Sequence, residues 1–267
     1  MATEAPTLAP VATPTANKTD DALGLDSAFL IQMARMPLFS LLWVAAAFLS
    51  HQIWAAIHPT GLNAGPLIVV CAGMILAAFI DGWALKVPNW VTLPLILSGW
   101  LLGLLHDLNV PVDSGTGGFG FAVVGTAFGF ILLFPMLAIG GVGVGDVKMQ
   151  MGFGTCVAAF FGTGTTTATA GMNAINGLGV IFWAFAFGAI AGGAFALVMI
   201  LMRRRFRENA AMVGEIFTDL QMFATGRSGQ ASQRAQDRRR IWVKLPYGIP
   251  LCVGFLLYLW SVLILLN

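Results

Sequence analysis

Charged side chains are scarce in this chain of 267 residues, since Asp, Glu, Lys and Arg together make up 10% of it. Hydrophobic residues make up 58%, and the mean hydropathy is +0.83. So little charge excludes an ordinary water-soluble domain and places the chain among polytopic membrane proteins. The apolar residues form long continuous runs rather than alternating strands, which argues against a membrane β-barrel.

Cysteine is also rare. The three cysteines, Cys71, Cys156 and Cys252, are isolated within apolar runs, and the sequence contains no Cys-x-x-Cys pair. Neither a zinc site nor a disulfide framework is therefore supported. We expect no metal, no other cofactor and no nucleic-acid partner.

The apolar runs are long enough to cross a bilayer as helices of about 20 residues. We expect an all-α fold, a polytopic membrane helical bundle of about seven transmembrane helices. Two glycine pairs, Gly125 with Gly129 and Gly188 with Gly192, have the Gly-x-x-x-Gly spacing typical of close helix packing. The expected segments are 37–57, 66–84, 89–105, 118–140, 147–164, 177–202 and 247–266.

The distribution of basic residues predicts the orientation. If the N-terminus lies in the cytoplasm and the segments alternate, all fourteen Lys and Arg residues fall on the cytoplasmic side. The outer connections near 58–65, 106–117 and 165–176 contain none. This sidedness is the positive-inside pattern, and it supports the number of segments as well as their direction.

Two aspartates stand at the ends of apolar runs, Asp81 in the second segment and Asp146 between the fourth and fifth. The predicted topology places both at the cytoplasmic surface of the membrane. An ionisable residue so close to hydrocarbon is costly and marks a functional site by default. Paired carboxylates can share a proton and activate water, so the two aspartates are candidate catalytic residues.

The run GVGVGDVK surrounds Asp146. Gly143 and Gly145 have no β-carbon, so other backbone, or a bound peptide, can approach the carboxylate closely. A glycine-rich turn in which Asp146 merely caps the next helix is an equally open interpretation of this motif alone. Lys148 follows two residues later, where it could contact substrate or anchor at the membrane interface.

A second group of residues follows Asp81, in DGWALKVPNWVT. Pro88 and Asn89 favour a turn, with Asn89 able to cap the following helix. Asn89 and Thr92 offer hydrogen bonds that could orient a site, and Lys86 could hold negative charge or serve as an interfacial anchor. Taken alone, this stretch also fits an ordinary cytoplasmic turn.

Together the two groups resemble the type IV prepilin peptidases, membrane aspartic proteases of the Gly-x-Gly-Asp kind. The resemblance runs through the residues named above, and the stretch Leu245–Pro250 (LPYGIP) looks like the entry to the last helix of that family. The absence of paired Cys-x-x-Cys motifs makes the chain similar to the short, peptidase-only branch associated with tight-adherence (Flp-type) pili.

Composition and the resemblance together predict three regions. Residues 1–36 would be a disordered, Ala/Thr/Pro-rich cytoplasmic tail, and 37–65 an extra N-terminal transmembrane helix with its outer loop. Residues 66–267 would be the peptidase core, with a basic cytoplasmic loop at 203–245. The protein would lie in the bacterial inner membrane, with prepilin and lipid as partners and the pilus-assembly machinery as a further candidate.

The expected reaction is removal of a short cytoplasmic leader that precedes an apolar helix of the prepilin. Two nearby carboxylates do not both ionise easily, so one should hold a proton. The ionised carboxylate would take a proton from the attacking water, and the protonated one would polarise the scissile carbonyl. Asp81 and Asp146 cannot be assigned separately to these roles, because such a pair titrates as a unit.

Three other functions stay open at this point, and one of them is a non-catalytic subunit of a pilus-assembly machinery. In a transporter or channel, acidic residues should lie near the bilayer midplane beside broken helices in repeated halves. In a protease of the signal-peptide-peptidase kind, the first aspartate follows a tyrosine and a Pro-Ala-Leu motif completes the site. Here Ile80 precedes Asp81 and Pro-Tyr-Gly comes later, so that resemblance is weaker.

Overall fold

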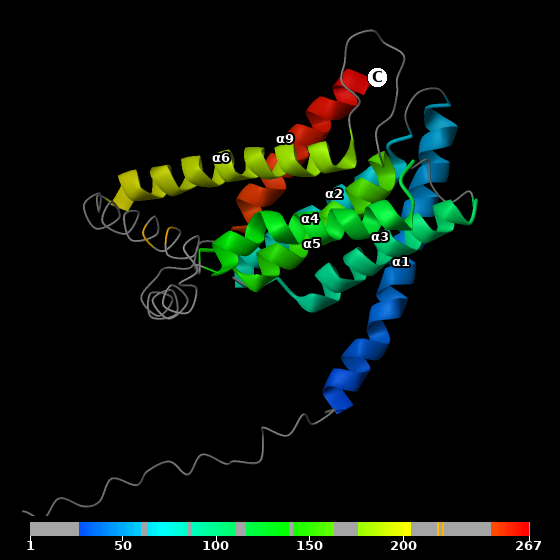
Figure 1. Ribbon diagram of the computed structural model, residues 1–267, viewed down its shortest axis with the longest axis horizontal. Helices are drawn as coiled ribbons and strands as arrows, with labels where there is room; N and C mark the ends of the chain where they lie inside the picture. Colours follow the sequence, from blue (N-terminus) through cyan, green and yellow to red (C-terminus); the bar gives the residue numbers. More distant parts are fainter. Residues whose placement is uncertain are drawn as a thin grey trace, which may run out of the picture.

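The computed structural model describes residues 27–59, 63–84, 87–110, 116–138, 141–162, 176–203, 218, 221 and 247–266. These residues form long helices and no strand (Figure 1). The helices are α1 (Ser27–Ile57), α2 (Gly65–Ala84), α3 (Asn89–Asp107), α4 (Phe119–Ala138), α5 (Val144–Phe161), α6 (Gly177–Arg203) and α9 (Gly248–Leu266).

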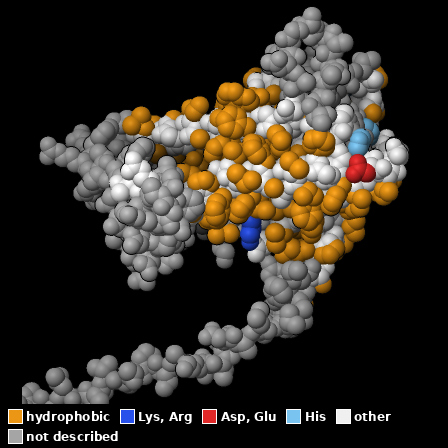
Figure 2. Space-filling view, in the orientation of Figure 1, with side chains coloured by type: hydrophobic (Ala, Val, Ile, Leu, Met, Phe, Trp, Pro, Cys, Tyr) orange, Lys and Arg blue, Asp and Glu red, His pale blue; other side chains and the backbone are white. Residues whose placement is uncertain are grey.

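Five of these helices, α1 to α4 and α6, are long and apolar enough to cross a membrane, and α9 contains a shorter apolar stretch over Gly248–Val262. Their outward faces carry large apolar side chains, such as Phe79, Ile190 and Trp260, which are each at least 66% exposed. Figure 2 shows such side chains over much of the described surface. The prediction of an all-helical membrane bundle is confirmed.

Helix α5 is less apolar than its neighbours because its sequence contains Asp146, Lys148 and Gln150. It lies inside the bundle, where α3, α4, α6 and α2 pack around it. Most residues of α5 are buried, and the ring of Phe153 packs against that of Phe255 in α9 with centroids 3.9 Å apart. Asp146 and Gln150 of α5 are therefore enclosed by protein rather than by lipid.

Glycines allow the closest helix contacts. A β-carbon on Gly125 of α4 would overlap the carbonyl oxygen of Gly154 in α5, and one on Gly129 would lie 2.6 Å from the carbonyl oxygen of Gln150. On α6, a β-carbon on Gly188 would lie 3.2 Å from the Cα of Leu251 in α9. Both predicted glycine pairs therefore lie at helix contacts, as their spacing indicated.

The first helix begins earlier than predicted, at Ser27 rather than residue 37. Residues 27–36 contain neither glycine nor proline, and the helix continues through Pro37, which interior helix positions seldom accept in water. The expected tail therefore cannot extend to residue 36. Residues 1–26 lie outside the described part of the chain, as does the loop at 203–245 except for Arg203, Thr218 and Gln221.

Candidate active site

Asp81 lies in the last turn of α2 and is 5% exposed. Its Oδ2 accepts a hydrogen bond of 2.9 Å from the backbone N–H of Gly248, the first residue of α9. The N-terminus of a helix carries free N–H groups and a partial positive charge, so it stabilises an anion placed there. Asp81 is thus held by a helix that begins 167 residues later in the sequence.

This contact requires glycine at position 248. A β-carbon there would lie 2.8 Å from Oδ2 of Asp81 and 3.1 Å from its Cβ. The next residue, Ile249, packs over Gly82, whose own β-carbon would lie 3.0 Å from Cδ1 of Ile249. The end of α2 and the start of α9 are therefore fitted together around the carboxylate of Asp81.

Asp146 lies inside α5 rather than in the connection before it, because the helix begins at Val144 and not near residue 147 as predicted. Gly143 is the N-cap residue, and its backbone N–H donates a hydrogen bond of 3.0 Å to Oδ2 of Asp146. An acidic side chain at this third helical position satisfies a backbone donor that the helix leaves free, which starts the helix earlier.

The two carboxylates share one environment. The charge of Asp81 acts electrostatically on the carboxyl group of Asp146, which is 6% exposed. Burial, together with the charge of Asp146, raises the pKa of the Tyr247 hydroxyl above its ordinary value. Tyr247 and Gly248 are consecutive, so the start of α9 touches the surroundings of both aspartates and joins the two halves of the site.

One oxygen of this site is buried without a partner. Oδ1 of Asp146 accepts no hydrogen bond from any of the residues that the structure describes, whereas Oδ2 is bound by Gly143. A buried carboxylate oxygen in this state is suited to receive a proton or a donor group that enters with substrate or water.

The connection between α2 and α3 packs against the start of α5. A β-carbon on Gly145 would lie 3.0 Å from Cβ and 3.2 Å from the backbone nitrogen of Val87, so Gly145 permits this approach. Pro88, with φ −75° and ψ 146°, is the N-cap residue of α3 and makes no side-chain cap. Lys86 lies outside the described residues.

Asn89 does not cap α3 as predicted, because it is already the first residue of the helix. Its Oδ1 instead accepts a hydrogen bond of 2.9 Å from Nζ of Lys148 in α5. This bond ties the start of α3 to the start of α5 and leaves Lys148 directed at Asn89 rather than at Asp146. Thr92, in the first turn of α3, is buried, and its Oγ1 has no hydrogen-bond partner among the described residues.

Two groups at the site were missed or only partly seen in the sequence. Gly248 was noticed only within a family-like stretch, and its bond to Asp81 has no local signal, because it joins segments far apart in the chain. Gln150 was not predicted as a site residue, although it follows Asp146 by one helical turn and is 2% exposed. Its polarity within an otherwise apolar segment was the available signal.

Residues 68–197 match the model of the type IV leader peptidase family. This part of the chain is similar to that family. The match includes both Asp81 and Asp146, whereas Gly248 and the rest of α9 lie beyond it. No curated protein and no solved structure matches the chain. A leader peptidase is a protease, and the buried carboxylates lie within the segment that defines the family.

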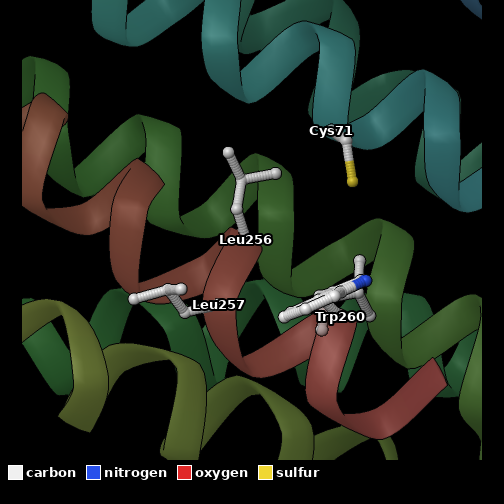
Figure 3. A pocket seen from close by; sticks show the side chains of 5 residues that line it. Cys71, Leu256, Leu257 and Trp260 are labelled. Carbon is white, nitrogen blue, oxygen red and sulfur yellow. The ribbon is translucent and has the colours of Figure 1, made fainter. Parts of the chain in front are cut away.

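A pocket of about 360 Å³ lies elsewhere, between α2 and α9 (Figure 3). It is lined by Cys71 of α2 and by Leu256, Leu257, Leu259 and Trp260 of α9. Cys71 precedes Asp81 by ten residues, about 15 Å along a helix. An apolar pocket at this distance from Asp81 offers no acid or base to a reaction. Within the described residues, no group of three His, Cys, Asp or Glu side chains could hold a metal ion.

Proposed function

We propose that this protein is a membrane aspartic endopeptidase that removes the cytoplasmic leader from type IV prepilins of the Flp type. The main support is the arrangement of Asp81 and Asp146. Both are buried, each accepts a backbone hydrogen bond at the start of a helix, and the charge of one acts on the other. The absence of Cys-x-x-Cys motifs supports the peptidase-only branch.

The pair supplies an acid and a base for hydrolysis of a peptide bond. The ionised carboxylate takes a proton from water as the water oxygen attacks the scissile carbonyl, and the protonated carboxylate polarises the carbonyl oxygen. The C–N bond then breaks, and the leaving nitrogen takes up a proton from the pair. One proton shared between Asp81 and Asp146 is sufficient, and the two act as a unit.

The substrate is a peptide segment at the cytoplasmic membrane surface. The aspartates lie at the end of the bundle where Lys148 is found, and the basic residues predict that this end faces the cytoplasm. A prepilin presents its cleavage site at this depth, because its leader is polar and the helix that follows is apolar. Carboxylates at helix ends are also unlike the midplane acidic residues expected of a transporter.

The experiment compares Asp81→Asn and Asp146→Asn with the wild-type protein in cleavage of a Flp-type prepilin, using purified protein in proteoliposomes. Each variant should lose at least about a hundredfold in rate, since acid or base catalysis by a positioned group contributes about 10²–10⁴. Asp107→Asn is the matched control, because Asp107 is exposed at the far end of α3 and binds Phe119 N. Near-normal cleavage by both site variants would refute the assignment.

A further inference from the structure

Gln150 carries a buried amide that the reaction described above does not use. It lies in the middle of the bundle on α5, and its side chain is 2% exposed. Its Nε2 donates no hydrogen bond to any residue within the described part of the chain. Buried donors are almost always paired, so an unpaired one inside a packed core calls for a functional explanation.

The position of Gln150 on its helix places this donor beside Asp146. Residues four apart on a helix are neighbours on one face, and Gln and Asp side chains at this spacing form hydrogen bonds. Long helical side chains tend to lean toward the N-terminus of the helix, and for Gln150 this is the direction of the turn that contains Asp146. The buried Oδ1 of Asp146 likewise has no partner among the described residues.

Nε2 of Gln150 and Oδ1 of Asp146 are both shielded from outside solvent. Gly129 of α4 lies against the backbone of Gln150, with its β-carbon position 2.6 Å from the carbonyl oxygen. Further along α5, Phe153 meets Phe255 of α9 and closes the core. A donor and an acceptor that each lack a partner therefore lie on neighbouring turns of α5 in an enclosed space, where one buried water can bridge them.

We propose that Gln150 is a positioning residue for Asp146, whose Oδ1 it binds through Nε2 by way of one buried water. Oδ2 of Asp146 is already fixed by Gly143, so a second bond at Oδ1 would lock the rotation of the carboxylate. The locked carboxylate keeps one orientation toward Asp81 and the scissile peptide. This inference rests on the proposed function and adds a residue to it.

The test replaces Gln150 with methionine, which keeps the length of the side chain and removes the amide. We expect kcat for prepilin cleavage to fall about tenfold or more, with KM within about twofold, because the substrate is bound elsewhere. The melting temperature should be unchanged or higher, since an unpaired buried polar group is replaced by an apolar one of similar shape.

Thr155→Val is the matched control. Thr155 is a fully buried residue of the same helix, its Oγ1 also has no partner among the described residues, and it lies nine residues beyond Asp146. The valine variant should cleave at the wild-type rate. Gln150→Leu serves as a second apolar variant and should show the same loss of kcat as Gln150→Met.

Two results would overturn this inference without affecting the proposed function. In one, the wild-type protein and Gln150→Met cleave with equal kcat. In the other, the losses of kcat in Gln150→Met and Gln150→Leu follow losses of melting temperature, which would make the amide a structural group. If the wild-type protein and Thr155→Val fail to cleave prepilin at all, the proposed function is overturned and this inference falls with it.

Discussion

The glycines around the two aspartates serve close approach rather than unusual backbone angles. Gly143 has φ −80° and ψ 155°, values that any residue can adopt, and its N–H binds Asp146. Gly145 makes room for Val87, and Gly248 makes room for the carboxylate of Asp81. The Gly-x-Gly-Asp motif therefore packs the start of α5 against the connection between α2 and α3.

Gly248→Ala should strongly impair cleavage. The added methyl group would lie 2.8 Å from Oδ2 of Asp81, so either the carboxylate or the start of α9 must shift. A misplacement of about 1 Å at a reacting group can cost about a hundredfold in rate. The measurement is kcat/KM for leader cleavage, together with the melting temperature in detergent.

Gly193→Ala is the control for this substitution, because a β-carbon at Gly193 of α6 meets no atom within 4 Å. The control should cleave at the wild-type rate. If Gly248→Ala cleaves as fast as Gly193→Ala, the close fit of Gly248 against Asp81 is not needed for the reaction.

Among single residues, those predicted best from the sequence were charged residues within apolar runs. Asp81 and Asp146 could be predicted as candidate site residues because charge is scarce in apolar runs. The bond from Gly248 to Asp81 could not be predicted, because it depends on how α9 docks against α2. Asn89 shows the converse error, since a residue that commonly caps helices binds Lys148 instead.

Among the helices, α5 differs most from a simple transmembrane segment. Its polar and small residues lower its hydropathy, yet it is the most enclosed helix, because the neighbouring helices rather than lipid surround it. Hydropathy identified the lipid-facing helices well, whereas the first residues of α1 and α5 were predicted too late in the sequence. Those ends depend on a proline that the helix tolerates and on the hydrogen bond between Gly143 and Asp146.

The contact between α4 and α5 predicts a difference between two glycines of the same helix. Gly125→Val should unfold the protein at lower temperature or prevent its accumulation, because its β-carbon would overlap the backbone of Gly154. Such overpacking costs about 1–3 kcal/mol or more, and here the obstacle is backbone that cannot rotate away.

Gly120→Val is the matched control, since a β-carbon at Gly120 meets no atom within 4 Å. Thermal unfolding in detergent should leave this variant close to the wild-type protein. Equal melting temperatures for the Gly120 and Gly125 variants would contradict the close contact of α4 with α5.

For the whole molecule, sidedness decides whether the site can meet a cytoplasmic leader. Asp81 and Asp146 lie near one end of the bundle, and Asp107 lies at the far end of α3. The charge distribution predicts that the aspartates face the cytoplasm.

Thiol labelling tests the orientation in a variant without native cysteines (Cys71→Ala, Cys156→Ala and Cys252→Ala). Val144→Cys, at an exposed position beside Asp146, should react with a membrane-impermeant reagent only in inverted vesicles. His58→Cys, at an exposed position after α1, should react only in spheroplasts. The opposite labelling pattern would place the carboxylates outside the cytoplasm and contradict the proposed substrate.

The convergence of the two carboxylates is most directly tested by cross-linking. In the same cysteine-free background, Asp81→Cys combined with Asp146→Cys should be joined efficiently by the shortest bifunctional thiol reagent. Asp107→Cys combined with Asp146→Cys should not be joined. Asp107 lies at the far end of α3, about 28 Å from the start of that helix, and it is the start of α3 that packs beside Asp146. Failure to cross-link positions 81 and 146, in a protein that melts like its parent, would contradict a shared site.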